Sequence, residues 1–203
     1  MNTLTTMIDP AADPFALFEA WFDEAKASEP NDPEAMTLAT IDAFGAPDAR
    51  IVLLKGHGPD GFAFYTNGES AKGRQLAGDR RAALVLHWKT LRRQVRVRGE
   101  VAPVAEAEAD SYFAARHRQS RLGAWASAQS RPLKHREELE AALAAAESRF
   151  AGIDPPRPPH WRGYRLTPTA IEFWADRPFR LHDRVLFARP DAATAWKATR
   201  LFP

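Results

Sequence analysis

The chain of 203 residues contains no cysteine, which excludes disulfide bonds, thiol nucleophiles and metal sites built on cysteine. It has no apolar stretch approaching the ~20 residues that a membrane-spanning helix requires. Residues 1–10 contain neither a basic residue nor an apolar run, so they do not have the pattern of a secretory signal. We therefore expect a cytoplasmic protein.

Several common functional motifs are also missing. The six histidines show neither HxH nor HExxH spacing, so we expect no metal site. There is no GxGxxG or Walker loop for a nucleotide, and no GxSxG elbow for a serine hydrolase. The net charge of +2 is too small to indicate general nucleic-acid binding, although Arg96 and Arg98 share one strand face.

What is present is the composition of a folded protein, since 45% of the residues are hydrophobic and 27% are charged. Residues 1–12 read as a loose tail, and residues 13–203 as a single domain. Asp13 and Pro14 are typical of a helix start, and the apolar spacing that follows predicts a helix to Ser28.

Beyond that helix the pattern is one of many short strands. Alternation and apolar runs predict strands near residues 36–41, 50–55, 62–66, 82–88, 94–101, 163–167, 170–174, 184–188 and 196–201. Helices are expected at residues 70–77, 105–116 and 132–150, with a polar loop at 118–130 and a stiff proline-rich connector at 154–159. The run 50–55 is mostly apolar, so we expect that strand to be largely buried. Together these elements predict a small β-barrel with helical additions.

Basic and hydroxyl side chains stand at the ends of several predicted elements, where a phosphate is commonly bound. Arg50 and Lys55 bound one strand, Thr66 follows Tyr65 at the end of another, and Lys72 lies in the first turn of a helix. Taken singly, each of them also suits a solvated strand end or a helix cap.

Three further groups are candidates for ligand contacts. Tyr112, Arg116 and Ser120 are spaced by four, which would place them on one face of a continuing helix and form a second anion pocket. An ordinary polar helix surface is the alternative. Gln129 and Ser130 can bond a polar ring or a phosphate. An extended segment would place Arg180, His182 and Arg184 on one side, suited to an anionic ligand or to a solvated strand face.

The motifs occur together in a specific order. They are Arg50 to Lys55 (RIVLLK), Phe64-Tyr65-Thr66-Asn67, Arg93-Gln94-Val95, Tyr112-x3-Arg116-x3-Ser120, Gly123-Ala124-Trp125, Gln129-Ser130, Ile171-Glu172-Phe173-Trp174, Arg180-Leu181-His182-Asp183-Arg184 and the final Arg200-Leu201-Phe202-Pro203. In this order they resemble the pyridoxamine 5'-phosphate oxidase family over about residues 13–203.

The resemblance implies an FMN-binding split β-barrel that works as a homodimer, with FMN at the subunit interface. It implies FMN contacts from Arg50, Ile51, Val52, Leu53, Leu54, Lys55, Tyr65, Thr66, Lys72, Gln94, Gln129, Ser130, Trp174 and Arg184. It implies substrate contacts from Lys55, Tyr112, Arg116, Ser120, Arg180, Leu181 and His182, with Arg180 and His182 as the catalytic candidates. Ala71 departs from the pattern, because many members have an arginine there.

The implied reaction is oxidation of pyridoxamine 5'-phosphate or pyridoxine 5'-phosphate to pyridoxal 5'-phosphate. The electron acceptor is O2, which yields hydrogen peroxide, and the amine substrate releases ammonia. The sequence leaves two alternatives open. One is a split-barrel flavoprotein with another substrate, since one fold hosts many functions. The other is a non-enzymatic carrier or flavin-binding module.

Overall fold

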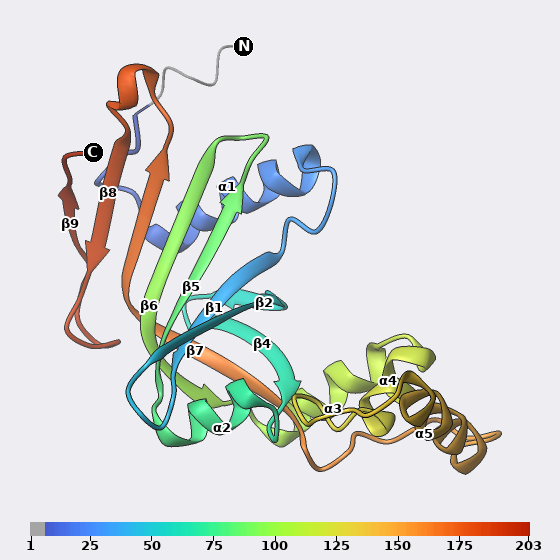
Figure 1. Cartoon of the computed structure of the whole chain (residues 1–203). Coiled ribbons are helices and arrows are strands. Elements are labelled where there is room, and N and C mark those ends of the chain that lie inside the picture. Colours follow the sequence, from blue (N-terminus) through green and yellow to red (C-terminus); the bar gives the residue numbers. More distant parts are fainter. Residues whose placement is uncertain (1–6) are drawn as a thin grey trace.

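The computed structural model describes residues 7–203, which fold mainly into antiparallel strands with helices at the periphery (Figure 1). The helices are α1 (Pro14–Ser28), α2 (Ala71–Gly78), α3 (Glu106–Ala115), α4 (Arg118–Ala126), α5 (Arg136–Arg149) and the 3-10 helix η1 (Pro178–Arg180). The strands are β1 (Ala35–Ile41), β2 (Pro47–Leu53), β3 (Gly56–Gly58), β4 (Gly61–Asn67), β5 (Arg81–Trp88), β6 (Arg93–Pro103), β7 (Trp161–Ala175), β8 (Asp183–Ala188) and β9 (Lys197–Arg200). The prediction of a mainly β fold with helical additions is confirmed.

These strands form one antiparallel sheet with the order β2-β1-β5-β6-β7-β4-β3. β7 pairs with β6 on one side. On its other side its first half pairs with β4 and its second half with β8, which also pairs with β9. Within residues 7–203 no ladder joins β2 to β3, so the curved sheet is an open barrel (Figure 1).

β7 replaces the two strands that the sequence predicts at 163–167 and 170–174. Gly99 of β6 pairs with Pro168 and Arg98 pairs with Ala170, so the register shifts and no β6 residue stands opposite Thr169 in the ladder. This bulge lets the strand continue past Pro168, a residue that cannot donate a backbone hydrogen bond. One continuous strand therefore links the two ends of the sheet.

Local sequence signals explain α1 and β6. The carboxylate of Asp13 accepts hydrogen bonds from the backbone N–H groups of Phe15 and Ala16, at 3.0 and 2.9 Å, and Pro14 occupies the first turn. In β6 the alternate residues Val95 and Val97 are fully buried. Both predictions are confirmed, because capping and period-two alternation are local properties.

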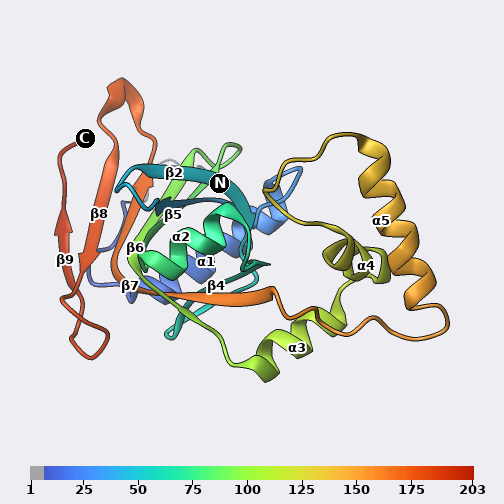
Figure 2. The same ribbon diagram turned by 60° about the horizontal axis from the view of Figure 1, so that its bottom comes forward.

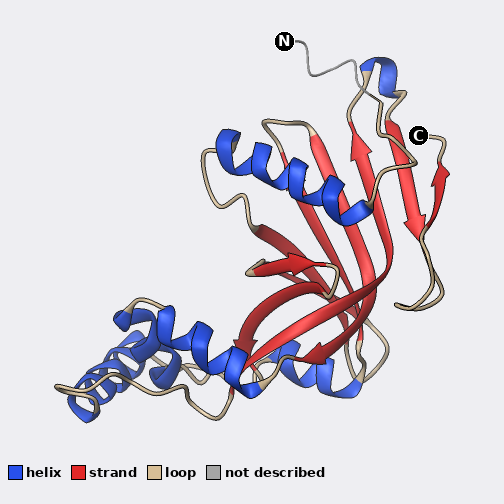
Figure 3. Ribbon diagram, turned by 180° about the vertical axis from the view of Figure 1, so that it is seen from behind, coloured by secondary structure: helices blue, strands red, loops and turns tan. Residues whose placement is uncertain are grey.

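The main core lies between α1 and the sheet. α1 crosses one face of the sheet (Figure 3) and buries Phe18, Trp21 and Phe22 against apolar side chains of the strands. The ring of Phe18 meets that of Phe62 edge to face at 4.9 Å, and Trp21 meets Phe173 in the same way at 5.2 Å. The first helix therefore fixes strands that lie far apart in the sequence.

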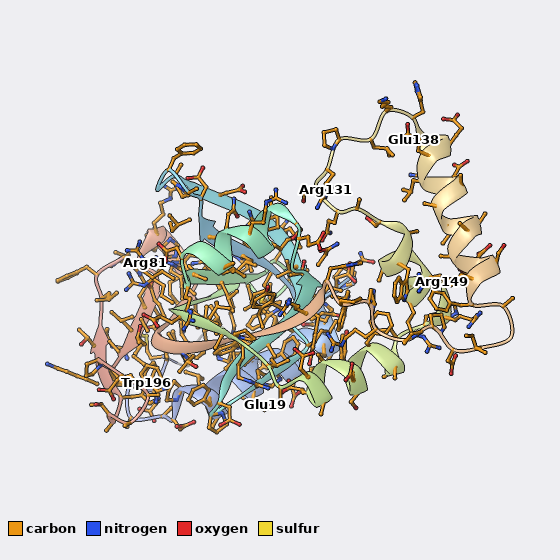
Figure 4. All side chains as sticks on the ribbon, turned by 90° about the horizontal axis from the view of Figure 1, so that it is seen from below. Glu19, Arg81, Arg131, Glu138, Arg149 and Trp196 are labelled. Carbon is orange, nitrogen blue, oxygen red and sulfur yellow. The ribbon has the colours of Figure 1, made fainter. Side chains whose placement is uncertain are left out.

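Helices α4 and α5 form an arm set apart from the sheet, and α3 lies between that arm and the start of β7 (Figure 2). Figure 4 shows Glu138 and Arg149 at the two ends of α5, well away from Trp196. The expectation of a loop at 118–130 is wrong for its first part, since α4 spans Arg118–Ala126. α4 packs through Leu122 on Ala146 and Phe150.

The proline-rich connector at 154–159 forms neither helix nor strand, and Arg157 ties it to α3. Its side chain is mostly buried and binds the carboxylates of Glu106 and Asp110, with 2.6 Å to the latter. The same guanidinium donates to the carbonyl of Trp161 at 2.7 Å. These contacts hold α3 against the start of β7.

The predicted burial of the strand at 50–55 is wrong in the single chain. Ile51 is 63% exposed and Leu53 is 40% exposed, although Leu54 is buried. β2 lies at the edge of the sheet and pairs only with β1, and no described residue covers the outward side chains of Ile51 and Leu53. An apolar edge of this kind is typical of a surface that another molecule covers.

Part of the expected loose tail is packed. Ile8 is only 4% exposed and belongs to the main core. Its N–H donates to the carboxylate of Asp183 at 2.6 Å, and its carbonyl accepts from Arg200 at 2.7 Å. Residues 1–6 lie outside the described residues. No helix within residues 7–203 is long and apolar enough to cross a membrane.

Candidate functional site

A cavity of about 430 Å³ opens where β2, β4, α2, α3 and α4 meet, and we call it the basic cavity. Its lining brings together most of the predicted ligand residues of the first half of the chain. The lining residues are Ile51, Val52, Leu53, Lys55, Tyr65, Thr66, Lys72, Tyr112, Arg116, His117, Ser120, Gln129 and Trp161. The volume is in the usual range for a small-molecule site.

Lys72 is the most enclosed cation of the basic cavity, with 8% of the residue exposed. Its ammonium donates to the hydroxyl of Thr66 at 3.2 Å, and no described carboxylate forms an ion pair with it. Burial and the nearby charge of Arg50 lower the pKa of Lys72. A buried ammonium held only by a hydroxyl favours an anionic ligand.

A close backbone approach places this lysine. Gly73 lies so near the carbonyl of Gly68 that a Cβ at residue 73 would overlap it. Ser70 caps α2 by accepting a hydrogen bond from the N–H of Gly73 at 3.2 Å. The first turn of α2 therefore sits directly on the end of β4, beside Thr66.

Arg116 supplies a second cation without an acidic partner. Its guanidinium lies 5.3 Å from the ring of Trp161 and 5.6 Å from that of Phe113. Its Nη1 atom is buried and has no hydrogen-bond partner among the described residues. Burial lowers the pKa of Arg116. Because an unpaired buried donor is costly, this atom is suited to a ligand oxygen.

An aromatic stack forms one wall of the cavity. The rings of Tyr65 and Tyr112 are 4.1 Å apart, and Trp161 stacks on Tyr65 at 5.1 Å. Burial and the carboxylate of Glu108 raise the pKa of Tyr65 to about 12, so its hydroxyl stays protonated and donates to Glu108 at 3.2 Å. A Cβ at Gly163 would lie 2.5 Å from the Tyr65 ring, so the stack requires glycine there.

The predicted helix face through Tyr112, Arg116 and Ser120 does not exist, because α3 ends at Ala115 and Arg116 is its C-cap. Helix α4 then begins at Arg118, with His117 as its N-cap. The three residues nevertheless line the same cavity from two helices. Their convergence is therefore a tertiary feature, not a consequence of spacing by four.

Four other residues with predicted FMN or substrate contacts differ in whether they reach the basic cavity. Lys55 lines the cavity and forms an ion pair with Glu34 at 3.2 Å. Arg50 does not line it, since its guanidinium binds Asp48 at 2.5 Å and Gln75 at 2.9 Å. Leu54 is directed into the core. Ser130 is exposed, has a φ of 68° and lies beside Gln129, which accepts from Thr66 at 3.4 Å.

The remaining candidates gather at the far end of β7. Gln94, Trp174 and Arg184 lie directly opposite one another on β6, β7 and β8. Side chains at paired positions share one face, so these residues form a row across the sheet. Beside the row is a second cavity of about 600 Å³, the loop cavity, lined by Arg92, Trp174, Asp176, Arg177, Pro178, Phe179, Arg180 and His182.

The loop cavity is built by a turn, not by the extended segment that the sequence predicts for residues 180–184. η1 ends at Arg180, and both Phe179 and Arg180 have positive φ, at 59° and 63°. Positive φ is unusual for such residues and is frequent at functional sites. His182 lies 3.0 Å from Asp176 and 4.7 Å from the ring of Trp174, while Leu181 is exposed.

The two cavities lie at opposite ends of β7. From Trp161 to Trp174 the strand rises about 3.3 Å per residue, or roughly 43 Å along its curved path. A ligand in the basic cavity of one chain therefore does not reach the loop cavity of the same chain. The spacing of these residues in the sequence does not reveal this separation.

The donors of the basic cavity fit a phosphorylated cofactor. Lys72 and Thr66 lie together at one place and Arg116 is unpaired at another, so two anionic groups have separate partners. The aromatic wall and the apolar residues of β2 suit a flat ring. The arrangement on a curved open barrel defines the class of FMN-binding split-barrel proteins.

Comparisons with known proteins identify the family within that class. Residues 22–150 match the family described as pyridoxamine 5'-phosphate oxidase, and residues 161–203 match the pyridoxine 5'-phosphate oxidase C-terminal dimerisation region. The chain belongs to the pyridoxamine 5'-phosphate oxidase family. As the family implies, its cofactor is FMN, and its C-terminal region is one that mediates dimerisation.

Individual relatives agree with this membership. The chain is 61% identical to the pyridoxine/pyridoxamine 5'-phosphate oxidase of Azorhizobium caulinodans, over 100% of this chain and 96% of the relative. It is 59% identical to that of Caulobacter vibrioides, over 94% and 85% of the two chains.

Solved structures agree as well. The crystal structure of PhzG from Burkholderia lata 383, in complex with tetrahydrophenazine-1-carboxylic acid, matches with a TM-score of 0.90 at 31% identity and covers both chains fully. A pyridoxamine 5'-phosphate oxidase-related, FMN-binding protein from Nostoc punctiforme shares the fold, with a TM-score of 0.75 at 18% identity over 95% of this chain and all of the other. The predicted FMN-binding split barrel is confirmed.

The structure adds residues that sequence reasoning missed. His117 and Trp161 line the basic cavity, and Arg177 lines the loop cavity. Trp161 follows the proline-rich connector at the start of β7. Its position directly after that connector is the one sequence feature that could have indicated a role in the site. His117 has no local signal, since its role depends on the break between α3 and α4.

Proposed function

We propose that this chain is an FMN-dependent oxidase that converts pyridoxamine 5'-phosphate and pyridoxine 5'-phosphate to pyridoxal 5'-phosphate, with O2 as electron acceptor. The observation that carries the proposal is the pair of enclosed, unpaired cations, Lys72 and Arg116, in a cavity with an aromatic wall. Two phosphate esters, one on the cofactor and one on the substrate, are the ligands that this pair suits. Relatives about 60% identical over nearly the whole chain carry the name of this activity.

Bound FMN would supply the redox chemistry by accepting a hydride from the substrate. Lys72 and Thr66 would hold the cofactor phosphate. Arg116, with Tyr112, Ser120 and Lys55, would hold the substrate phosphate. Fixing both partners by their phosphates turns their encounter into an oriented one, which lowers the entropic part of the barrier.

The loop cavity enters the reaction through a second copy of the chain. The resemblance assigns Arg180 and His182 to catalysis, so these two residues must reach the substrate. The length of β7 between the two cavities prevents this within one chain. The C-terminal dimerisation region, residues 161–203, supplies every lining residue of the loop cavity except Arg92. We therefore infer a homodimer of domains spanning residues 13–203, with FMN at the interface between the basic cavity of one copy and the loop cavity of the other.

A spectroscopic experiment tests the activity. The purified FMN-loaded protein is mixed anaerobically with pyridoxamine 5'-phosphate, and the flavin absorbance is followed. We expect bleaching, then recovery of the colour when O2 is admitted, with formation of pyridoxal 5'-phosphate. A colour that persists with this substrate but bleaches with tetrahydrophenazine-1-carboxylic acid, the compound in the Burkholderia lata structure, would instead support a carboxylate substrate.

Complementation between two inactive variants tests the shared site. Arg116→Ala removes a residue of the basic cavity, and Arg180→Ala one of the loop cavity. A mixed dimer then holds one site with both defects and one with none, so random mixing should restore about 25% of wild-type activity. Activity that stays at the level of the separate variants would show that both residues act within one chain.

A further inference from the structure

The loop cavity contains an acid to which the proposed oxidation assigns no role. Asp176 directly follows β7, and within the described part of the chain it is the one carboxylate among the lining residues of this cavity. Its side chain is only 16% exposed, and its two oxygens have different partners. Oδ1 lies 3.0 Å from Nδ1 of His182, and Oδ2 pairs with the guanidinium of Arg92. The acid therefore connects a catalytic candidate to the turn between β5 and β6.

The position of Asp176 is fixed by the backbone as well as by this ion pair. Its N–H donates to the carbonyl of Arg92 at 3.0 Å. Arg92 has a φ of 53°, and its own N–H closes the turn by donating to the carbonyl of Lys89 at 3.2 Å. The β5–β6 turn thus holds the carboxylate through the oxygen that does not face His182.

The imidazole of His182 is held on two sides. Its Nδ1 atom faces Asp176, and the ring lies 4.7 Å from that of Trp174. Its Nε2 atom has no hydrogen-bond partner within residues 7–203 and is not a buried atom. Since His182 lines the loop cavity, Nε2 is the ring nitrogen that a ligand can reach.

The carboxylate decides which ring nitrogen of His182 carries the proton. A neutral imidazole has one N–H, and its hydrogen-bond partners determine which nitrogen that is. The backbone N–H of Arg177 lies 3.3 Å from Nδ1 and favours an unprotonated Nδ1, but the carboxylate of Asp176 is closer and charged. Lone pairs of the two atoms would otherwise oppose each other across 3.0 Å. Nδ1 therefore carries the proton, and the lone pair of Nε2 is left free.

We propose that Asp176 is a positioning residue for the oxidation, which holds the Nδ1 proton of His182 so that Nε2 accepts a proton from the substrate. This inference rests on the proposed function, in which His182 reaches the substrate. With pyridoxine 5'-phosphate, C4' loses a hydride to the bound FMN, and the hydroxyl on C4' gives its proton to Nε2. The alcohol becomes the aldehyde, and His182 becomes an imidazolium whose charge Asp176 balances.

Asp176→Asn tests this role with almost no change of shape. Because Arg92 donates to one oxygen of the side chain, the amide oxygen should remain there and the amide NH2 should face His182. That NH2 and the N–H of Arg177 then both donate to Nδ1, so the proton moves to Nε2, which can no longer accept one. We expect kcat for pyridoxine 5'-phosphate to fall at least ~10-fold. KM should stay within about 3-fold, because the predicted phosphate contacts lie in the basic cavity.

The ring nitrogens of His182 report the position of the proton directly. The FMN-loaded protein, labelled with 15N at histidine, is studied by NMR in mildly alkaline buffer, and His182→Gln identifies the signals of this ring. We expect the proton on Nδ1 in the wild type and on Nε2 in Asp176→Asn. A purely structural role of Asp176 would leave the proton where it is.

Two further variants separate positioning from support of the turn. Asp79→Asn is the matched control, since Asp79 also pairs with an arginine, Arg81 (labelled in Figure 4), at 2.5 Å, and neither residue lines the loop cavity or the basic cavity. It should keep both the wild-type kcat and the Nδ1 proton of His182. Arg92→Met removes the ion pair to the turn but leaves the carboxylate, so Nδ1 should keep its proton there too.

Melting temperature and FMN content show whether each variant is folded. The inference is overturned if Asp176→Asn leaves the proton on Nδ1, or if it turns over pyridoxine 5'-phosphate as fast as the wild type. Loss of the Nδ1 proton in Arg92→Met would also overturn it, because Asp176 would then act only through the turn. If the wild type itself oxidises neither substrate, the proposed function fails, and the NMR signals still decide whether Asp176 sets the ring of His182.

Discussion

Arg116 offers a sharp test of the site, because the structure predicts opposite effects on stability and on function. The change is Arg116→Met, which keeps an extended apolar stem against Phe113 and Trp161 but removes the guanidinium. In the ligand-free protein the buried Nη1 atom has no partner, and such a donor costs about 1–3 kcal/mol. The lost cation–π contacts with the two rings are worth about 0.5–1 kcal/mol.

When no ligand is bound, the cost of the unpartnered Nη1 donor exceeds the stabilisation from the cation–π contacts, so the variant is favoured. We expect the free energy of unfolding of the ligand-free Arg116→Met protein to equal that of the wild type or to exceed it by about 1–2 kcal/mol. Catalysis should change in the other direction. Losing two charge-assisted hydrogen bonds to a phosphate, at about 1.5 kcal/mol or more each, should lower kcat/KM at least ~100-fold.

Urea denaturation and steady-state kinetics measure the two effects. Arg118→Met is the matched control, because the guanidinium of Arg118 donates to the carbonyls of Phe150 and Ile153, at 2.6 Å each, and lies outside the basic cavity. That control should lose stability and keep its kcat/KM. If Arg116→Met were destabilised as much as the control and retained its kcat/KM, Arg116 would be a structural residue and the reasoning would fail.

Three further changes have expected outcomes. Lys72→Ala should weaken FMN retention, measured as flavin content after dialysis at micromolar protein; full occupancy would count against its role. Arg180→Ala should lose most turnover while keeping FMN, and equal turnover in variant and wild type would remove it from the site. Burial against Phe18 and Phe22 lowers the pKa of His57, so its protonation favours the unfolded state and the melting temperature should fall from pH 7 to pH 5. His57→Gln should flatten that decline, and an unchanged pH profile would contradict the assignment to His57.

The elements that the sequence predicts well depend on neighbours in the chain. The cap at Asp13 and the alternation through Val95 and Val97 need no long-range contact, so they can be recognised locally. Helix α4 was missed because its sequence is polar and contains Gly123. It is stable where Leu122 meets Ala146 and Phe150, a contact that only the folded arm provides.

In the site, too, the residue types could be predicted from the sequence, whereas their arrangement depends on long-range contacts. The types of residue that hold phosphates were predictable, and most of those expected in the basic cavity lie there. The grouping of these residues into two separate cavities was not predictable from the sequence. Arg50 is held by Asp48 and Gln75, and Arg180 lies at the other end of β7. The apolar run at 50–55 predicts burial, but Ile51 is exposed because β2 is an edge strand that pairs only with β1.

Asp183 joins three distant parts of the chain. Its carboxylate, on a residue 3% exposed, accepts from the N–H of Ile8 and from Arg200, and it directly follows His182 in sequence. A protein trimmed beyond Ile8 during expression or storage would leave a buried acid short of a donor next to a catalytic candidate. A stored protein would then lose activity through cleavage at a site some 175 positions away from Asp183 in sequence. The intact mass of a preparation with low activity should therefore be measured before the low activity is attributed to missing FMN.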